Sequence, residues 1–342
     1  MRGGDVLLTK DSETADDIGV SAYVPLDLPG VLCGYHLALA RPRRSAIDGR
    51  FLRWALVSAA SRQQLEVAAT GVTRFGLRQD AVGGMTIPVP PLREQAAIAG
   101  YLDAETARID AVVAARQSQI DLLRLRLRAA IDEQFETVAG TWRLKHLLVR
   151  PLEYGASEAA GDDDPSWPRY VRTTDIDDEG NLRPETFRSL PPNVAAPYRL
   201  RDGDLLLTRS GATVGKSLLW REEWGRACFA GYLIRARPDP SRVMPEYLSY
   251  FVRSSRFWDE IRLTTIQATI PNVSAERYGD LRVPLPRLDS QLASVRRLDA
   301  VRRSARTLGQ VMEEQVRALV ERREALITAA VTGQLDIPGV AA

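Results

Sequence analysis

The chain contains an internal duplication whose two copies are separated by almost the length of a whole domain. The segment GDVLLTK, from Gly4, matches GDLLLTR, which begins 199 residues later at Gly203. Further along, IPVPPLREQ (87–95) matches VPLPRLDSQ (283–291), and Leu102 matches Leu298 at a spacing of 196 residues. Solenoid repeats are only about 20–45 residues long. Each copy is therefore predicted to be a globular module with an accessory element.

The two copies are unequal at their beginnings. The second copy extends back from its GDLLLT strand to about Trp142, whereas only three residues precede the GDVLLT strand of the first copy. The first module is therefore predicted to lack its front half, and a half-domain of this kind leaves sheet edges and apolar faces open.

Within each copy the hydrophobic pattern predicts an α+β module. Residues 169–177, 204–211 and 226–238 are β-rich runs bounded by Gly, Pro and Asp. Residues 244–263 and their counterparts 51–67 place apolar side chains at helical spacing. We expect mixed, half-buried strands packed against helices.

A long helix is predicted after the proline-rich segment of each copy, because the apolar period becomes helical there and no proline interrupts it. About forty residues at 1.5 Å each make a helix about 60 Å long, which one small module cannot cover. Each long helix is therefore expected to pair with the other. Duplication favours an antiparallel coiled coil, although an ordinary core helix is the commoner origin of such a stripe. The predicted seam is Leu102, Ile109, Val112, Ile120, Leu123, Leu127, Leu298, Leu308, Leu319 and Leu326.

These patterns predict five segments along the chain. They are a partial first module (1–96), a first long helix (97–138), a complete second module (139–288), a second long helix (289–336) and a tail (337–342).

The composition permits nucleic-acid binding without requiring it. The formal net charge is +2, and only three cations are lysines, at positions 10, 145 and 216. Arginine suits bidentate contacts to phosphates and base edges, although a coding bias toward arginine gives the same composition. Two cysteines without CxxC spacing and two histidines are too few for a zinc site. No leader-like or membrane-spanning apolar run is found, which predicts a cytoplasmic protein with reduced thiols.

The segment SGATVGKS (210–217) is similar to a phosphate-binding loop, but its glycine spacing does not fit that motif. It is better interpreted as a small-residue loop that approaches DNA, and a solvated β-turn is the alternative. In the first copy, Lys10 is followed by an acidic tip that would repel phosphate, although its carboxylates could still accept hydrogen bonds from cytosine. Asp175 is predicted to be a structural cap. The candidate DNA-binding residues are Arg172, Thr173, Thr174, Arg209, Ser210, Thr213, Lys216 and Lys10.

Four segments together resemble the specificity subunits of type I restriction-modification enzymes. They are IPVPPLREQAAIAGYLD (87–103), RTTDID (172–177), GDLLLTRSGATVGK (203–216) and ALITAAVTGQLDIPG (325–339). The resemblance covers nearly the whole chain. It implies two α+β target-recognition domains, the first incomplete here, joined by long helices that pair antiparallel.

The resemblance also implies DNA binding without catalysis. Each recognition domain would read one half of a split double-stranded target, and the helices would set the unread spacer. By the same analogy the chain docks two methylation subunits and, through them, the restriction and motor subunits. S-adenosylmethionine, ATP and magnesium would belong to those partners, and no cofactor or metal is expected on this chain.

The residues leave several alternatives open. No carboxylate-plus-lysine nuclease pattern, NPP[FY] motif, complete Walker box or GxSxG elbow occurs, so an enzyme with an unrecognised site ranks last. A coiled-coil scaffold with protein-binding ends is the main non-DNA alternative. The incomplete first module has three explanations: a start upstream of Met1, a silent or recombining cassette, or a chain that reads one half-site.

Overall fold

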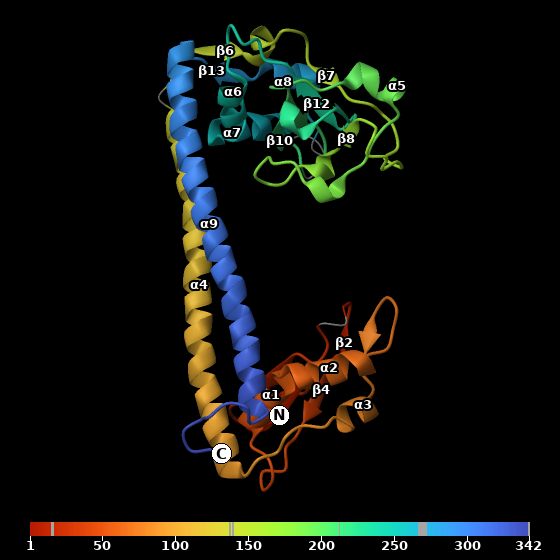
Figure 1. The fold of residues 1–342 in the computed structure, drawn as a ribbon, viewed down its shortest axis with the longest axis vertical. Coiled ribbons are helices and arrows are strands. Elements are labelled where there is room, and N and C mark those ends of the chain that lie inside the picture. Colours follow the sequence, from red (N-terminus) through yellow and green to blue (C-terminus); the bar gives the residue numbers. More distant parts are fainter. Residues whose placement is uncertain (15–16, 137, 139, 212, 266–271, 341–342) are drawn as a thin grey trace. The chain divides into compact units, whose positions relative to one another are not determined.

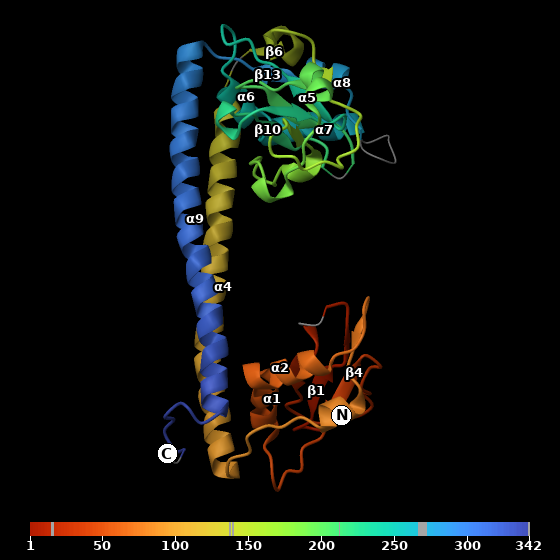
Figure 2. The ribbon, with the colours of Figure 1, turned by 45° about the vertical axis from the view of Figure 1, so that its right-hand side comes forward.

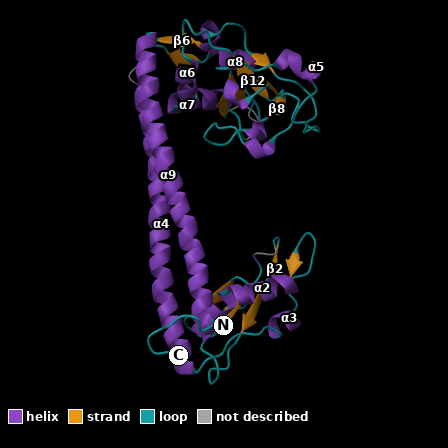
Figure 3. Ribbon diagram, viewed as in Figure 1, coloured by secondary structure: helices purple, strands orange, loops and turns teal. Residues whose placement is uncertain are grey.

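The computed structural model describes residues 1–14, 17–136, 138, 140–211, 213–265 and 272–340. The chain divides into two compact units, one formed by Met1–Ile120 with Gly309–Ala342 and the other by Asp121–Leu308. Two long helices, α4 (Leu92–Glu136) and α9 (Leu288–Val331), each contribute to both units. Figure 3 shows that helix dominates these two segments, while the strands lie in the rest of each unit.

The first unit is built on a three-stranded antiparallel sheet of order β3-β1-β4. A separate two-stranded ribbon pairs β2 with β5, and three helices follow in the sequence. Figure 2 shows α1 and α2 beside this sheet. The bounds are β1 (Val6–Thr9), β2 (Asp11–Ser12), β3 (Ser21–Tyr23), β4 (Leu37–Ala40), α1 (Gly49–Val57), α2 (Ala59–Ala68), β5 (Phe75–Gly76) and α3 (Gln79–Gly83).

The second unit repeats this sheet and extends it by one strand, in the order β10-β9-β12-β7. Two further pairs, β11 with β8 and β13 with β6, complete its strands among the described residues. Figure 1 shows these strands enclosed by short helices. The strands are β6 (Thr141–Arg143), β7 (Glu153–Tyr154), β8 (Arg169–Val171), β9 (Leu205–Thr208), β10 (Ser217–Leu219), β11 (Ala227–Phe229), β12 (Leu233–Ala236) and β13 (Arg282–Pro284). The helices are η2 (Leu144–Leu147), η3 (Thr173–Asp175), η4 (Pro184–Thr186), α5 (Pro192–Ala195), η5 (Ala196–Tyr198), η6 (Glu222–Trp224), α6 (Pro245–Phe251), α7 (Ser255–Thr265) and α8 (Ala275–Asp280).

Strand register confirms the duplication at atomic level. Ser21 of β3 is opposite Leu8 of β1, and Ser217 of β10 is opposite Leu207 of β9. Strands β6, β7 and β8 have no counterpart among the described residues of the first unit. The α+β class of each module, and the two long helices that accompany them, are therefore confirmed.

A buried glutamine fastens each module to the helix that follows it. Gln95 accepts a hydrogen bond from the Asp48 amide (2.8 Å) and donates to the Ala46 carbonyl (3.0 Å). Gln291 accepts from the Met244 amide (2.9 Å) and donates to the Arg242 carbonyl (3.1 Å).

Each glutamine makes one more contact, to a carbonyl of the proline segment just before it: Gln95 donates to Pro90 at 2.6 Å and Gln291 to Pro286 at 2.9 Å. Both glutamine side chains are fully buried. The two junctions therefore use the same set of contacts, in which the side-chain amide of the glutamine hydrogen-bonds only to backbone groups.

Two further contacts recur in both modules. Asp5 receives two hydrogen bonds from Arg41, each 2.8 Å, and Asp204 receives two from Arg237, at 2.6 and 2.7 Å. Hydrogen bonding to Arg41 holds the pKa of the Asp5 carboxyl well below its usual range. This pair joins the aspartate of the GDxLLT motif to the arginine that directly follows β4 in the first module and β12 in the second.

An aromatic side chain of each module also bonds an aspartate of the adjoining long helix. Trp54 donates from Nε1 to Asp103 at 2.8 Å, and Tyr250 donates from its hydroxyl to Asp299 at 2.6 Å. Aspartate is therefore retained at this helix position while the donor changes from indole to phenol.

Within each unit the two long helices run in opposite directions. In the first unit, Leu102 shares a core cluster with Ala330, and Asp110, further along α4, pairs at 2.9 Å with Arg323, which is earlier in α9. In the second unit Gln134 bonds Arg297 at 2.9 Å. None of the described helices is long and apolar enough to cross a membrane.

The buried and half-buried positions of the long helices follow a heptad pattern, with alternating intervals of four and three residues. In α4 they are Leu102, Thr106, Ile109, Val113, Arg116, Ile120, Leu123 and Leu127. In α9 they are Leu298, Arg302, Ala305, Gly309, Met312, Val316, Leu319, Arg323 and Leu326. The same register therefore occurs in both copies, and it includes several polar and small residues.

Eight of the ten predicted seam residues occupy these positions, and two do not. Val112 and Leu308 are each 45% exposed, so they are corrected to surface positions. Their neighbours Val113 and Gly309 take the inward positions. Val112 and Leu308 were predicted to lie in the seam because they are apolar. The heptad spacing instead places the next residue, Val113 or Gly309, on the inner face.

We predict that Leu123→Asp destabilises the helix pair by about 2–4 kcal/mol, because it places a charge at an inward position. Leu122→Asp is the matched control, since Leu122 is 62% exposed, and it should cost less than about 1 kcal/mol. Urea denaturation followed by circular dichroism measures both. Equal destabilisation by the two variants would refute the assigned register.

A second prediction concerns the glutamine junction. Gln291→Leu should lower the free energy of unfolding by about 2–3 kcal/mol, because it leaves buried backbone groups without partners. The exposed Gln310 of the same helix provides the control substitution Gln310→Leu, which should have little effect. A Gln291→Leu protein as stable as the control would show that the junction does not depend on this amide.

Candidate nucleic-acid interface

The loop predicted to approach DNA connects β9 to β10 in the second unit. It is a tight turn in which the Gly215 amide bonds the Thr208 carbonyl (3.0 Å) and the Lys216 amide bonds the Thr213 carbonyl (3.0 Å). Gly215 adopts a positive φ of 86°, and a Cβ there would lie 2.6 Å from the Trp258 ring. The loop is therefore held against α7, with Ser210 and Thr213 half-buried on it.

Arg209, at the start of this loop, is held by stacking and by backbone contacts. Its guanidinium carbon lies 4.8 Å from the centre of the Tyr154 ring. Its amide bonds the Tyr232 carbonyl (3.0 Å), and its carbonyl accepts from the Val273 amide (2.8 Å). The Nε atom is buried and has no hydrogen-bond partner among the described residues. Arg209 is thus oriented by β7, a strand without a counterpart among the described residues of the first unit.

Lys216 connects this loop to the second candidate segment. Its ammonium group forms an ion pair with Asp178, and this contact lowers the pKa of the Asp178 carboxyl. Asp178 is 84% exposed, whereas Lys216 is only 25% exposed. The structure therefore brings Lys216 beside the turn that follows RTTDID, and a carboxylate partly neutralises the lysine.

The RTTDID segment forms the 3₁₀ turn η3, with Thr174 exposed and Thr173 half-buried. Asp175 is fully buried and accepts from the Arg172 amide at 2.7 Å, which is the structural cap that the sequence predicted. Arg172 donates to Asp175 (2.9 Å) and to the Thr186 carbonyl (2.6 Å). Much of its donor capacity is used inside the protein.

Lys10, the candidate in the first unit, lies over the Tyr35 ring at 4.4 Å from its centre. His36 beside it bonds Asp11 at 3.1 Å, so an acidic group adjoins this lysine. Lys10 corresponds to Arg209, since each follows the threonine that ends the central strand. The first unit therefore presents one lysine where the second unit combines Arg209 and Lys216.

Two tyrosines beside these cations were missed as candidates. Tyr35 is 80% exposed and Tyr232 is 67% exposed, and each precedes the strand that pairs with the GDxLLT strand. An exposed aromatic ring near a cation can stack on a base. The sequence did contain a signal for these tyrosines, because a Gly-Tyr pair recurs at matching positions of the two copies. That match was used to align the repeat and not to select binding residues.

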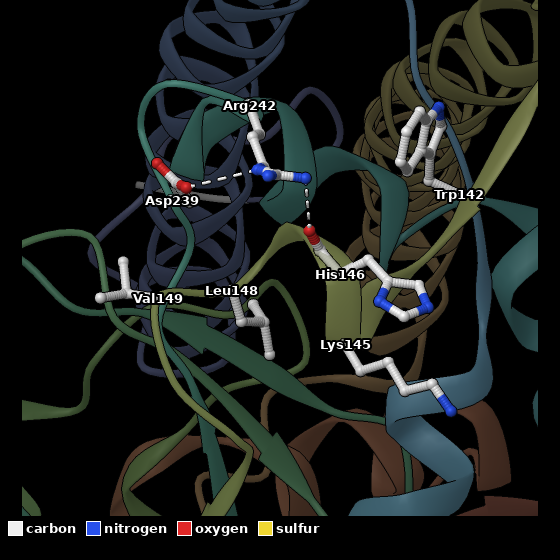
Figure 4. A pocket seen from close by; sticks show the side chains of 7 residues that line it. All are labelled: Trp142, Lys145, His146, Leu148, Val149, Asp239 and Arg242. Atoms are coloured by element: carbon white, nitrogen blue, oxygen red, sulfur yellow. Dashed lines mark hydrogen bonds and ion pairs between the residues drawn. The ribbon is translucent and has the colours of Figure 1, made fainter.

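The second unit also contains a cavity of about 600 Å³. Figure 4 shows its lining residues, which are Trp142, Lys145, His146, Leu148, Val149, Asp239 and Arg242. Its cations have partners within the protein: Lys145 pairs with Asp280 at 2.8 Å, and Arg242 pairs with Asp239 at 3.5 Å. Among the described residues no cluster of three or more His, Cys, Asp or Glu could hold a metal ion. This cavity therefore does not combine free cations in the manner of a phosphate site.

Comparisons with known proteins agree on one family. No family model matches the chain. It is 24% identical over 360 residues to the EcoKI specificity subunit of Escherichia coli (strain K12), covering 97% of this chain and 75% of that protein. It is also 24% identical to the StySPI specificity subunit of Salmonella potsdam, covering 97% and 74% respectively.

The fold agrees with these sequence relatives. A solved chain from a study of complex assembly in the type I restriction-modification system superposes with a TM-score of 0.78 at 21% identity, covering 98% of this chain and 83% of that one. Both sequence relatives are specificity subunits of type I restriction enzymes. Over nearly its whole length the chain is therefore similar to the specificity subunits of type I restriction enzymes, in sequence and in fold.

Proposed function

We propose that this chain is the DNA-binding specificity subunit of a type I restriction-modification complex and that it reads a split double-stranded target. One observation carries the proposal: two α+β modules of the same build are fastened by the same glutamine junction to two long helices. Sequence similarity to specificity subunits supports this interpretation. In this proposal the modules are residues 1–96 and 139–288, and the helical segments are 97–138 and 289–336.

The second module is proposed to carry the stronger half of the interface. Arg209, Ser210, Thr213 and Lys216 lie on one tight turn, and the ion pair of Lys216 with Asp178 brings the RTTDID segment beside it. Cations contribute phosphate affinity, while the threonine and serine hydroxyls can bond base edges. The first module, with Lys10 beside acidic Asp11, would bind phosphate more weakly.

The helices are proposed to set the unread spacer and to hold the partner subunits. A helix of 44 residues is about 66 Å long, enough to separate half-sites whose centres are about 34–36 Å apart on DNA. Two methylation subunits and, through them, the restriction subunits would assemble on it. S-adenosylmethionine, ATP and magnesium would be bound by those partners, and the complex would act in the cytoplasm.

We predict that Arg209→Ala and Lys216→Ala each weaken DNA binding by the assembled complex about tenfold, because each removes a cation from the interface. Affinity is measured at several salt concentrations, and each substitution should also reduce the salt dependence. Arg150→Ala in the same unit is the control. Unchanged affinity in both variants would remove this loop from the interface, and affinity independent of salt would favour a protein-binding scaffold.

A further prediction follows from the Lys216–Asp178 ion pair. Asp178→Asn should tighten DNA binding several-fold at low salt, because it frees Lys216 and removes a negative charge from the surface. The same substitution in the Lys216→Ala background should give a smaller gain, and this double variant is the control. An equal gain in both backgrounds would mean that Asp178 acts only through general repulsion.

A further inference from the structure

The first unit contains a cavity of about 400 Å³ into which arginines from three helices converge. Arg53 comes from α1, Arg62 from α2 and Arg323 from α9. The opposite wall is the segment Asp17–Ser21, which leads into β3. Every lining residue belongs to the first unit. Three guanidinium groups around one cavity destabilise the folded protein electrostatically unless an anionic group enters the cavity.

The guanidinium groups of Arg53 and Arg323 lie beside the same aromatic ring. The Arg53 guanidinium carbon lies 3.7 Å from the centre of the Trp54 ring, and that of Arg323 lies 6.0 Å from the same centre. Burial and the charge of Arg323 lower the pKa of Arg53. The buried Nε atom of Arg323 lies 2.9 Å from an Asp110 carboxylate oxygen, in an ion pair without hydrogen-bond geometry.

Nearby carboxylates of the protein neutralise only some of these arginines. Arg62 pairs with Glu324 at 3.1 Å and Arg323 with Asp110 at 2.9 Å, and both of those carboxylates are more than half exposed. Asp17 lines the cavity as well. No carboxylate of the described residues forms an ion pair with Arg53.

The second module shows what fills the corresponding hollow. Register equates Ser21 with Ser217, and sequence alignment equates Val57 with Arg253. Between Ser217 and Arg253 lies Gly180, the tip of the turn Asp177–Asn181. A Cβ at Gly180 would come within 2.7 Å of both the Ser217 carbonyl and the Arg253 guanidinium. The turn therefore packs where the first module has its cavity.

Charge holds this turn in place. Asp178 pairs with Lys216, and Asn181 accepts from Arg302 at 2.7 Å. Arg253 is half-buried, and the charges of Asp177 and Glu179 raise its pKa against a larger lowering by burial. The acidic turn thus offsets cations that the module buries. These cations occupy different sequence positions from those of the first module, yet they surround the same hollow.

We propose that the arginine-lined cavity of the first module is a docking site for an acidic, glycine-tipped turn of a partner polypeptide, with the chemistry of Asp177–Asn181. Carboxylates of the turn pair with Arg53, Arg62 and Arg323, and the glycine lets its backbone approach Ser21. This inference concerns a protein ligand, so its failure and the failure of the proposed DNA binding are separate outcomes.

The test uses the full chain and a cyclised, fluorescently labelled peptide with the sequence of residues 175–183. Anisotropy should show saturable binding, and Arg53→Gln should weaken it about tenfold by removing a charged partner. Arg78→Gln is the matched control, because Arg78 is 77% exposed on the same unit and does not line the cavity. A peptide with Asn, Asn and Gln at positions 177–179 should not bind.

A gain-of-affinity variant keeps the test decisive even if Arg53→Gln folds poorly. Val20 is 57% exposed and lines the cavity, and it corresponds to Lys216. Val20→Lys should recreate the ion pair with Asp178 and tighten peptide binding several-fold. No binding, equal binding of the neutral peptide, or no response to both substitutions would overturn the proposal. Binding of inorganic phosphate without binding of the peptide would overturn it too.

Discussion

The long helices depend on each other, and the rest of the structure depends on their pairing. Helices of 45 and 44 residues extend far beyond any single small module, so most of their inward positions must be covered by a second helix. The heptad register is repeated in both copies, but it includes Arg116, Gly309 and Arg302 as well as leucines. Ile120 is buried between the ends, but most of the other inward positions there are only half-buried, whereas Leu102 and Leu298 near the ends are fully buried.

Those ends are also where the modules attach, so packing and attachment reinforce each other. Trp54 contributes to the same apolar cluster as Leu102 and bonds Asp103 of the helix. Phe135, at the other end of α4, is buried among residues of the second module. Within each unit the module therefore packs on the long-helix residues of that unit, and a substitution at a junction should destabilise both the module and the helices.

Much of this architecture was readable from the sequence, because repetition and period are robust signals. The duplicated GDxLLT strands, the proline segments and the helical period predicted two α+β modules and two long helices, and Asp175 was expected to be a cap. Individual side chains were less predictable. Val112 and Leu308 were predicted to be seam residues because they are apolar, although the heptad spacing places their neighbours in the seam. The stacking of Arg209 on Tyr154, the neutralisation of Lys216 by Asp178 and the exposed Tyr35 and Tyr232 depend on contacts between segments far apart in the sequence.

The glutamine junction has an evolutionary consequence. Gln95 and Gln291 bind main-chain amides and carbonyls, and the residues that supply those groups differ between the copies: Asp48 and Ala46 in one, Met244 and Arg242 in the other. A clamp that contacts only the main chain imposes almost no demand on the side chains of the module it holds. A lineage could therefore exchange one module for another, or let its surface diverge rapidly, while the joint to the helix stayed unchanged.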